Sequence, residues 1–152
     1  RSIQELKEDK STGRILTANL VTPKYWRTYG IHIIEAMHAV MGGDIGTVRN
    51  IGAFGEEIVH VKYNDNRHAV LQSFLGIKKG HRGFFGENKS LFPEDQDAFY
   101  QFKSMLEAFL RMLRTGEAPF DWKETVQTVK VLIAAQLSLE ENGREIHLEE
   151  VV

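Results

Sequence analysis

The sequence contains no cysteine, only three prolines and no long hydrophobic run. The lack of cysteine excludes disulfides and thiolate metal sites, and it is compatible with the reducing, cytoplasmic setting in which we expect the protein. The longest apolar stretch, 129–139, is interrupted by polar residues. It is far shorter than the roughly 20 residues that span a bilayer, so no membrane partner is expected.

An excess of positive charge is also missing, because 19 basic residues face 21 acidic ones and the net charge is -2. Clustered Lys and Arg supply most of the affinity for phosphates, so nucleic acid is not an expected partner. The 152 residues, of which 42% are hydrophobic, are enough for one ordinary soluble domain over 1–152. The chain opens on Arg1 rather than Met, so we expect it to be a piece of a longer protein.

Periodicity and turn residues predict the secondary structure. Helices are expected at 2–13, where Ser2 and Glu5 form a capping box, at 28–41 with Thr28 as the N-cap, at about 99–113, and at 121–143. Strands are expected at 14–22, 46–54, 57–63, 69–77, 83–86 and 145–149. The turns 64–67 and 78–81 suggest consecutive hairpins, and hence an antiparallel meander.

The expected fold class is α+β: a mostly antiparallel, open-faced sheet of about six strands with helices packed on one face. The long helix carries an apolar stripe that predicts packing on the sheet. Strand 69–77 has apolar residues on both sides, so the uncovered face is expected to be an interface.

The segment 25–35 gathers reactive side chains at the start of a predicted helix. His32 is the candidate acid/base, because imidazole exchanges protons near neutral pH, and Glu35 follows it. A satisfied structural histidine is the alternative. His32, Glu35 and His38 are spaced i, i+3 and i+6, which is poor geometry for three ligands on one metal, so no metal site is predicted. His38 is expected to face solvent or pack in a helix seam.

A polar, aromatic loop is expected to precede His32, and it contains Tyr25, Trp26, Arg27 and Tyr29. Aromatic rings with a cation are typical of sites for sugar-like ligands. The alternative is that these rings close the helix onto the sheet edge. Likewise, the basic cluster 78–82 could bind a phosphate or could be an ordinary solvent-exposed turn. The sequence has no glycine-rich phosphate loop after a strand.

These features together resemble the C-terminal domain of the Gfo/Idh/MocA oxidoreductases. The resemblance covers nearly the whole chain in the order of its elements. Its sharpest matches are Gly30-Ile31-His32-Ile33-Ile34-Glu35 and the small-residue helix around Ala134-Ala135-Gln136-Leu137-Ser138, which precedes a closing strand.

The resemblance implies a two-domain enzyme in which an N-terminal Rossmann domain, absent from this chain, holds NAD or NADP. This domain would supply the substrate wall for a sugar or polyol and would pair through its open sheet. His32 would take the proton from a substrate hydroxyl, while Tyr25, Trp26, Arg27, Thr28, Tyr29 and Glu35 would line the site. The fragment alone is not expected to turn over.

One position departs from the family pattern. Thr28 stands where an Asp usually works with the histidine, and threonine cannot supply a carboxylate's charge. A non-catalytic ligand-binding or assembly module of the same fold is therefore the rival hypothesis, and a free-standing scaffold protein is a third.

Overall fold

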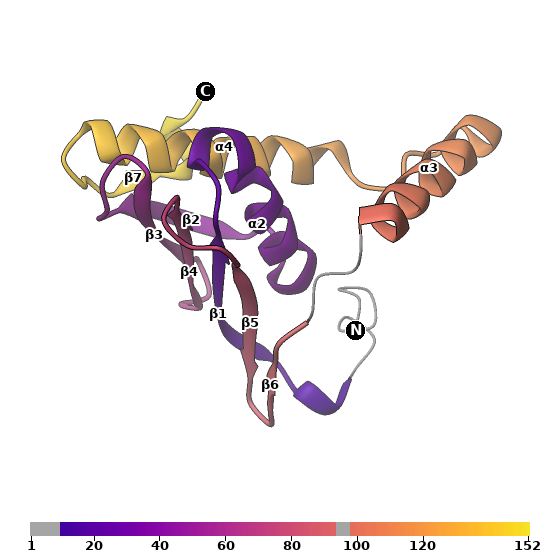
Figure 1. Ribbon diagram of the computed structural model, residues 1–152, viewed down its shortest axis with the longest axis horizontal. Helices are drawn as coiled ribbons and strands as arrows, with labels where there is room; N and C mark the ends of the chain where they lie inside the picture. Colours follow the sequence, from indigo (N-terminus) through magenta and orange to yellow (C-terminus); the bar gives the residue numbers. More distant parts are fainter. Residues whose placement is uncertain (1–9, 94–97) are drawn as a thin grey trace.

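The computed structural model describes residues 10–93 and 98–152. Its strands are β1 (Ile15–Thr22), β2 (Ile45–Asn50), β3 (Glu56–Tyr63), β4 (His68–Phe74), β5 (His81–Gly86), β6 (Ser90–Leu91) and β7 (Ile146–His147). Its helices are α2 (Trp26–Met41), α3 (Ala98–Thr115) and α4 (Trp122–Glu140), with 3-10 turns at Lys10–Thr12 and Leu148–Glu150 (Figure 1). Most of the helix predicted over 2–13 lies outside the described residues.

All seven strands form one sheet in the order β6-β5-β1-β4-β3-β2-β7. Only β1 and β4 are parallel neighbours, and every other pair is antiparallel. The predicted α+β class is confirmed. The expected count of about six strands was one short, because the two-residue strand β6 was not predicted.

The predicted meander is correct for β2, β3 and β4 and wrong for β5. Asn66, with φ 65°, provides the left-handed residue in the turn between β3 and β4. The segment 75–80 is no hairpin turn, because β1 lies between β4 and β5 and pairs with both. Ala18 and Leu20 of β1 are fully buried, and the central position of β1 in the sheet gives both of its edges a neighbouring strand.

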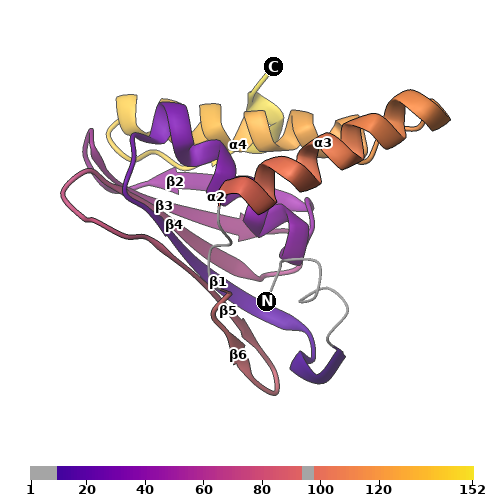
Figure 2. The same ribbon diagram turned by 45° about the vertical axis from the view of Figure 1, so that its right-hand side comes forward.

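Two helices cover one face of this sheet (Figure 2). Helix α2 packs on β1 and β4, helix α4 packs on β2 and β7, and the two helices contact each other. Ala134 and Ala135 are completely buried, so small side chains allow α4 to lie close to its neighbours. Asp121 caps α4 as predicted, since its side chain accepts a hydrogen bond from the Lys123 amide at 3.0 Å.

Helix α4 ends three residues earlier than expected, at Glu140. The left-handed residue predicted at Gly143 is present, with φ 81°, and Asn142 before it is also left-handed. A Cβ at position 143 would lie 3.2 Å from the Asn50 carbonyl, so glycine also allows close approach to β2. The closing strand is the predicted edge strand, shortened to β7.

Helix α3 contradicts the prediction that it packs on the sheet. It projects away from the sheet on the side of α2 and α4 (Figures 1 and 2). Its apolar stripe stays exposed, from 42% at Leu106 to 78% at Phe99. The periodicity predicted an amphipathic helix correctly, but it could not identify which surface the stripe meets.

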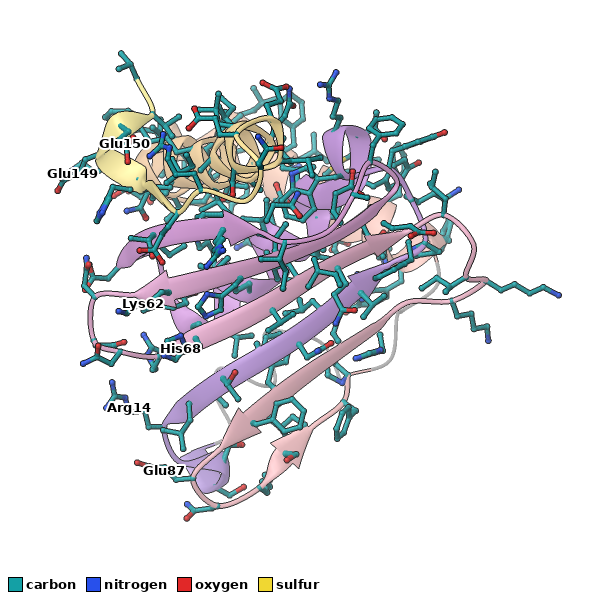
Figure 3. All side chains as sticks on the ribbon, turned by 90° about the vertical axis from the view of Figure 1, so that its left-hand side faces the viewer. Arg14, Lys62, His68, Glu87, Glu149 and Glu150 are labelled. Atoms are coloured by element: carbon teal, nitrogen blue, oxygen red, sulfur yellow. The ribbon has the colours of Figure 1, made fainter. Side chains whose placement is uncertain are left out.

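Figure 3 looks onto the other face of the sheet, which no helix of the described part covers. Along β4 the residues of this face, Val70, Gln72 and Phe74, are half-buried, while Ala69, Leu71 and Ser73 point into the core. Lys62 and His68, labelled in Figure 3, pair across β3 and β4 at one edge of this face. Within residues 10–93 and 98–152, no helix has the length and apolar character needed to cross a membrane.

Candidate functional site

Helix α2 begins earlier than the sequence predicted. Tyr25 is its N-cap and Trp26 its first residue, so the expected loop of aromatic residues is in fact the first helical turn. Thr28 is not the cap. Its Oγ1 donates to the Tyr25 carbonyl at 3.3 Å, and this bond ties the threonine hydroxyl to its own helix.

Trp26 explains the early start. Its side chain is 2% exposed, and its Nε1 donates to the Leu132 carbonyl of α4 at 3.1 Å. A Cβ on Gly30 would come within 2.9 Å of the Trp26 ring and 3.1 Å of Leu132, so Gly30 makes room for the indole. Trp26 therefore belongs to the core between α2 and α4, and its ring is not available for a ligand to stack on.

Arg27 also turns towards α4. Its guanidinium lies 3.5 Å from the Glu140 carboxylate, and both side chains are more than half exposed. An exposed pair of this kind contributes at most about 1 kcal/mol to stability. The structure thus places Arg27 on the α4 side of α2.

His32, Glu35 and Tyr29 lie together on the exposed side of α2. His32 Nδ1 is 3.4 Å from Glu35 Oε2, and both side chains are nearly 60% exposed. The Tyr29 ring stands edge-on to the imidazole, with 5.6 Å between the ring centroids. Since Nδ1 faces the carboxylate, Nε2 is the nitrogen left for a ligand.

Lys24 completes this group, although the sequence analysis did not single it out. Its Nζ lies 5.6 Å from the centroid of the Tyr29 ring. The buried Ser73 hydroxyl of β4 donates to the Lys24 carbonyl and so fixes the connection between β1 and α2. A lysine directly after the Pro23 that closes β1 was the available signal.

Phe54 is a second residue that the sequence analysis missed. It is 69% exposed in the turn between β2 and β3, and its ring lies 5.8 Å from that of Tyr25. The prediction that the strand 46–54 includes Phe54 is wrong, because β2 already ends at Asn50. The glycines at 52 and 55 were the signal that the strand ends earlier. Tyr25 and Phe54 form an exposed aromatic pair beside the start of α2.

The basic cluster 78–82 lies beside the end of β1, where α2 begins. A Cβ on Gly80 would lie 1.9 Å from the Val21 carbonyl and 3.3 Å from Pro23, so this segment runs tightly against the end of β1. Lys78, Lys79 and His81 are exposed there. Cations from two connections therefore gather at the edge where the parallel strands β1 and β4 both end.

His38 lies in the seam between α2 and α4, one of the two positions expected for it. It is 8% exposed, and its Nδ1 lies 2.8 Å from the Thr128 hydroxyl. Burial lowers the pKa of His38 from 6.5 to about 4, so the imidazole is neutral at pH 7. The described residues contain no group of three His, Asp or Glu side chains that could hold a metal ion.

The seven-stranded sheet with two helices on one face is a fold that the chain shares with several solved dehydrogenases and oxidoreductases. No protein-family model and no curated protein sequence matches the chain. Solved structures do. A probable dehydrogenase from Thermotoga maritima matches 99% of the chain with a TM-score of 0.78 and 17% identity.

Two further solved structures have the same fold. The scyllo-inositol dehydrogenase from Lactobacillus casei, solved with NAD(H) and scyllo-inositol, matches 96% of the chain with a TM-score of 0.80 and 15% identity. An oxidoreductase from Agrobacterium radiobacter, solved with NAD+, L-tartaric acid and magnesium, matches 99% with a TM-score of 0.76 and 10% identity. The chain spans 60–62% of the length of these three proteins. The fold implied by the resemblance is confirmed.

Proposed function

We propose that the chain is the substrate-binding and dimerising part of a longer, cytoplasmic NAD(P)-dependent oxidoreductase of the Gfo/Idh/MocA type, acting on a sugar or related polyol. The observation that carries this proposal is the fold, which extends over at least 96% of the chain in solved dehydrogenases and oxidoreductases. A histidine with a carboxylate beside it, exposed on α2, supports it.

The cofactor would be held by another part of the longer polypeptide, because this chain has no glycine-rich loop between a strand and a helix. When bound, NAD(P)+ supplies the acceptor for the hydride that leaves the substrate carbon. The residues of this chain would bind and orient the substrate and move its proton.

His32 would be the acid/base. Its Nε2 would take the hydroxyl proton as the hydride leaves the same carbon, so that the CH–OH group becomes a carbonyl. Glu35 would hold the imidazole through Nδ1 and stabilise the imidazolium that forms. Glu35, one helical turn after His32, would thus supply the carboxylate that Thr28, one turn before His32, cannot supply.

Tyr29 and Lys24 would contact the substrate. An aromatic ring suits the apolar face of a sugar, and the Lys24 ammonium above that ring can donate hydrogen bonds to hydroxyl or carboxylate groups. Tyr25 and Phe54 would form an outer wall. Trp26 and Arg27, which the sequence suggested for this role, contact α4 instead.

The test uses the full-length protein with a panel of sugars, inositols and sugar acids, following reduced cofactor by absorbance. We expect activity on at least one member, and His32→Ala should lower kcat by about 10² to 10⁴ because the proton acceptor is lost. His68→Ala, which removes an exposed histidine on the opposite face of the sheet, is the control.

Full activity of His32→Ala would contradict the assigned role. Thr28 favours the rival hypothesis, a non-catalytic binding module of the same fold. Full-length protein that binds cofactor and sugar but never exchanges hydride would support that rival.

A further inference from the structure

Helix α3 carries an uncovered apolar surface. Six large side chains repeat along one side of it and form what we call the α3 stripe: Phe99, Phe102, Leu106, Phe109, Leu110 and Leu113. Each is at least 42% exposed, and α3 packs closely on none of the described strands or helices. Isolated exposed apolar residues are ordinary, but a continuous stripe marks an interaction surface.

The side of α3 away from the stripe is polar. Lys103, Glu107 and Arg111 follow one another at i, i+4, so this charged row runs from the border of the stripe at Lys103 to the opposite side of the helix at Arg111, and Lys103 Nζ lies 3.8 Å from Glu107 Oε1. A helix that is polar on one side and apolar on the other buries its apolar side against a partner. Phe120 and Trp122, which follow α3 in the sequence, are also exposed.

The position of the α3 stripe limits what can cover it. Helix α3 lies on the side of the sheet that carries α2, and the open sheet face lies on the other side (Figures 1 and 2). One partner therefore cannot cover both surfaces. A second copy of the chain, as proposed above, accounts for the open face and leaves the α3 stripe free.

The solved structures with this fold indicate the remaining partner. The chain spans 60–62% of their length, so about two fifths of each of those proteins lies outside the shared fold. His32 also lies on the helical side, on α2. A domain that brings a nicotinamide to His32 must approach from that side, because the sheet separates the open face from α2.

We infer that the α3 stripe is the surface on which the cofactor-binding domain of the same longer polypeptide docks. This inference rests on the proposed function. The stripe's spacing of i, i+3, i+7 and i+11 suits packing against a helix or the apolar face of a sheet. Docking would bury the six side chains and hold the cofactor domain on the side of the catalytic histidine.

The absence of cysteine from the chain makes a direct test possible. Phe102→Cys places a thiol on the α3 stripe, and Arg111→Cys places one on the polar side of the same helix. Both variants are made in the 152-residue chain and in the full-length protein, with any cysteines of the remaining part replaced by serine. The rate of labelling by a thiol reagent is then measured under native conditions.

The thiol at position 102 is expected to react at least about tenfold more slowly in the full-length protein, because labelling then requires the domains to separate. The thiol at position 111 should react equally fast in both. Hydrogen exchange of the α3 amides in the two unsubstituted proteins checks the same point without removing Phe102. Equal labelling and equal exchange in the two proteins would overturn the inference.

Two further measurements separate this inference from the proposed function. Titration of the full-length protein with NADH and NADPH, followed by fluorescence, tests for a cofactor domain. If the full-length protein binds cofactor but the α3 stripe is not protected, the inference is refuted and the proposed function still stands. If the stripe is protected but no cofactor binds, the covering partner is not a cofactor-binding domain. Labelling of position 102 in the 152-residue chain that slows as dimers form would mean that a second copy covers the stripe.

Discussion

Glu35 is the residue that most changes the interpretation of His32. The family pattern expects the carboxylate one turn before the histidine, where this chain has Thr28. The structure instead places the Glu35 carboxylate 3.4 Å from His32 Nδ1, one turn after it. The i, i+3 spacing made this contact predictable from the sequence. The burial of Trp26 was not predictable, because it depends on α4, about a hundred residues away.

His38 shows how little an isolated histidine in a sequence reveals about its environment. His32 and His38 lie on the same helix, yet one is exposed and the other is buried against Thr128. The seam with α4 decides the difference. Burial lowers the pKa of His38 to about 4, so this side chain is a structural, neutral imidazole at pH 7.

The stability of the domain should therefore fall as the pH is lowered from 6.5 towards 4. Because the folded pKa of His38 lies below the unfolded value of 6.5, its contribution is complete above pH 6.5 and is lost as the pH falls towards 4. The full loss is about 3 kcal/mol. His38→Gln keeps a partner for Thr128 but does not titrate, so the free energy of unfolding should depend less steeply on pH in this window. Urea unfolding at several pH values measures it.

An unchanged slope in His38→Gln would show that the buried imidazole does not contribute to the acid sensitivity of the fold.

At the scale of elements, α4 owes its position to small and polar residues. Ser138 is fully buried, accepts from the Asn50 amide at 2.8 Å and donates to the Arg144 carbonyl at 2.6 Å. The Asn50 side chain in turn donates to the Ala135 carbonyl at 3.3 Å. The small-residue segment noted in the sequence is thus the part of α4 that is joined to the end of β2.

Ser138→Ala should lower the free energy of unfolding by about 1–3 kcal/mol, because it removes the partner of the buried Asn50 amide and of the partly buried Arg144 carbonyl. Chemical denaturation of the 152-residue chain measures the change. Ser90→Ala, at an exposed position of β6, should change stability by less than about 0.5 kcal/mol. Equal effects of the two substitutions would refute the role given to Ser138.

Helix α3 makes the opposite point about elements. Its amphipathic period was evident in the sequence, and the helix formed as predicted. Its partner was assigned wrongly because periodicity identifies an apolar side and carries no information about the surface that side meets.

At the scale of the whole molecule, the sheet has one face covered by α2 and α4 and one open face. The open face is partly apolar around Val70, which pairs in register with Asn19 of β1 and His60 of β3. His60 stacks on His68, with 2.9 Å between their ring nitrogens. Burial and the neighbouring His68 lower the pKa of His60 from its ordinary value.

We predict that the protein dimerises through this face, and Val70→Asp should weaken the dimer by roughly 100-fold because it places an unpaired carboxylate at the centre of the interface. Sedimentation equilibrium measures the dissociation constant. Thr125→Asp adds the same charge at an exposed position of α4 and should leave the dimer intact. A monomeric parent protein, or equal dissociation constants for the parent and both variants, would contradict the prediction.

The sequence by itself determined the α+β class, the helix periods, the turn at Asn66 and the presence of His32 and Glu35 on one helix, because each depends on residues close together in the chain. Only the tertiary structure placed β1 between β4 and β5, buried Trp26 and His38 against α4, joined Ser138 to β2 and left the α3 stripe uncovered. These features depend on contacts between distant segments, and local propensity carries no record of which distant surface a residue will meet.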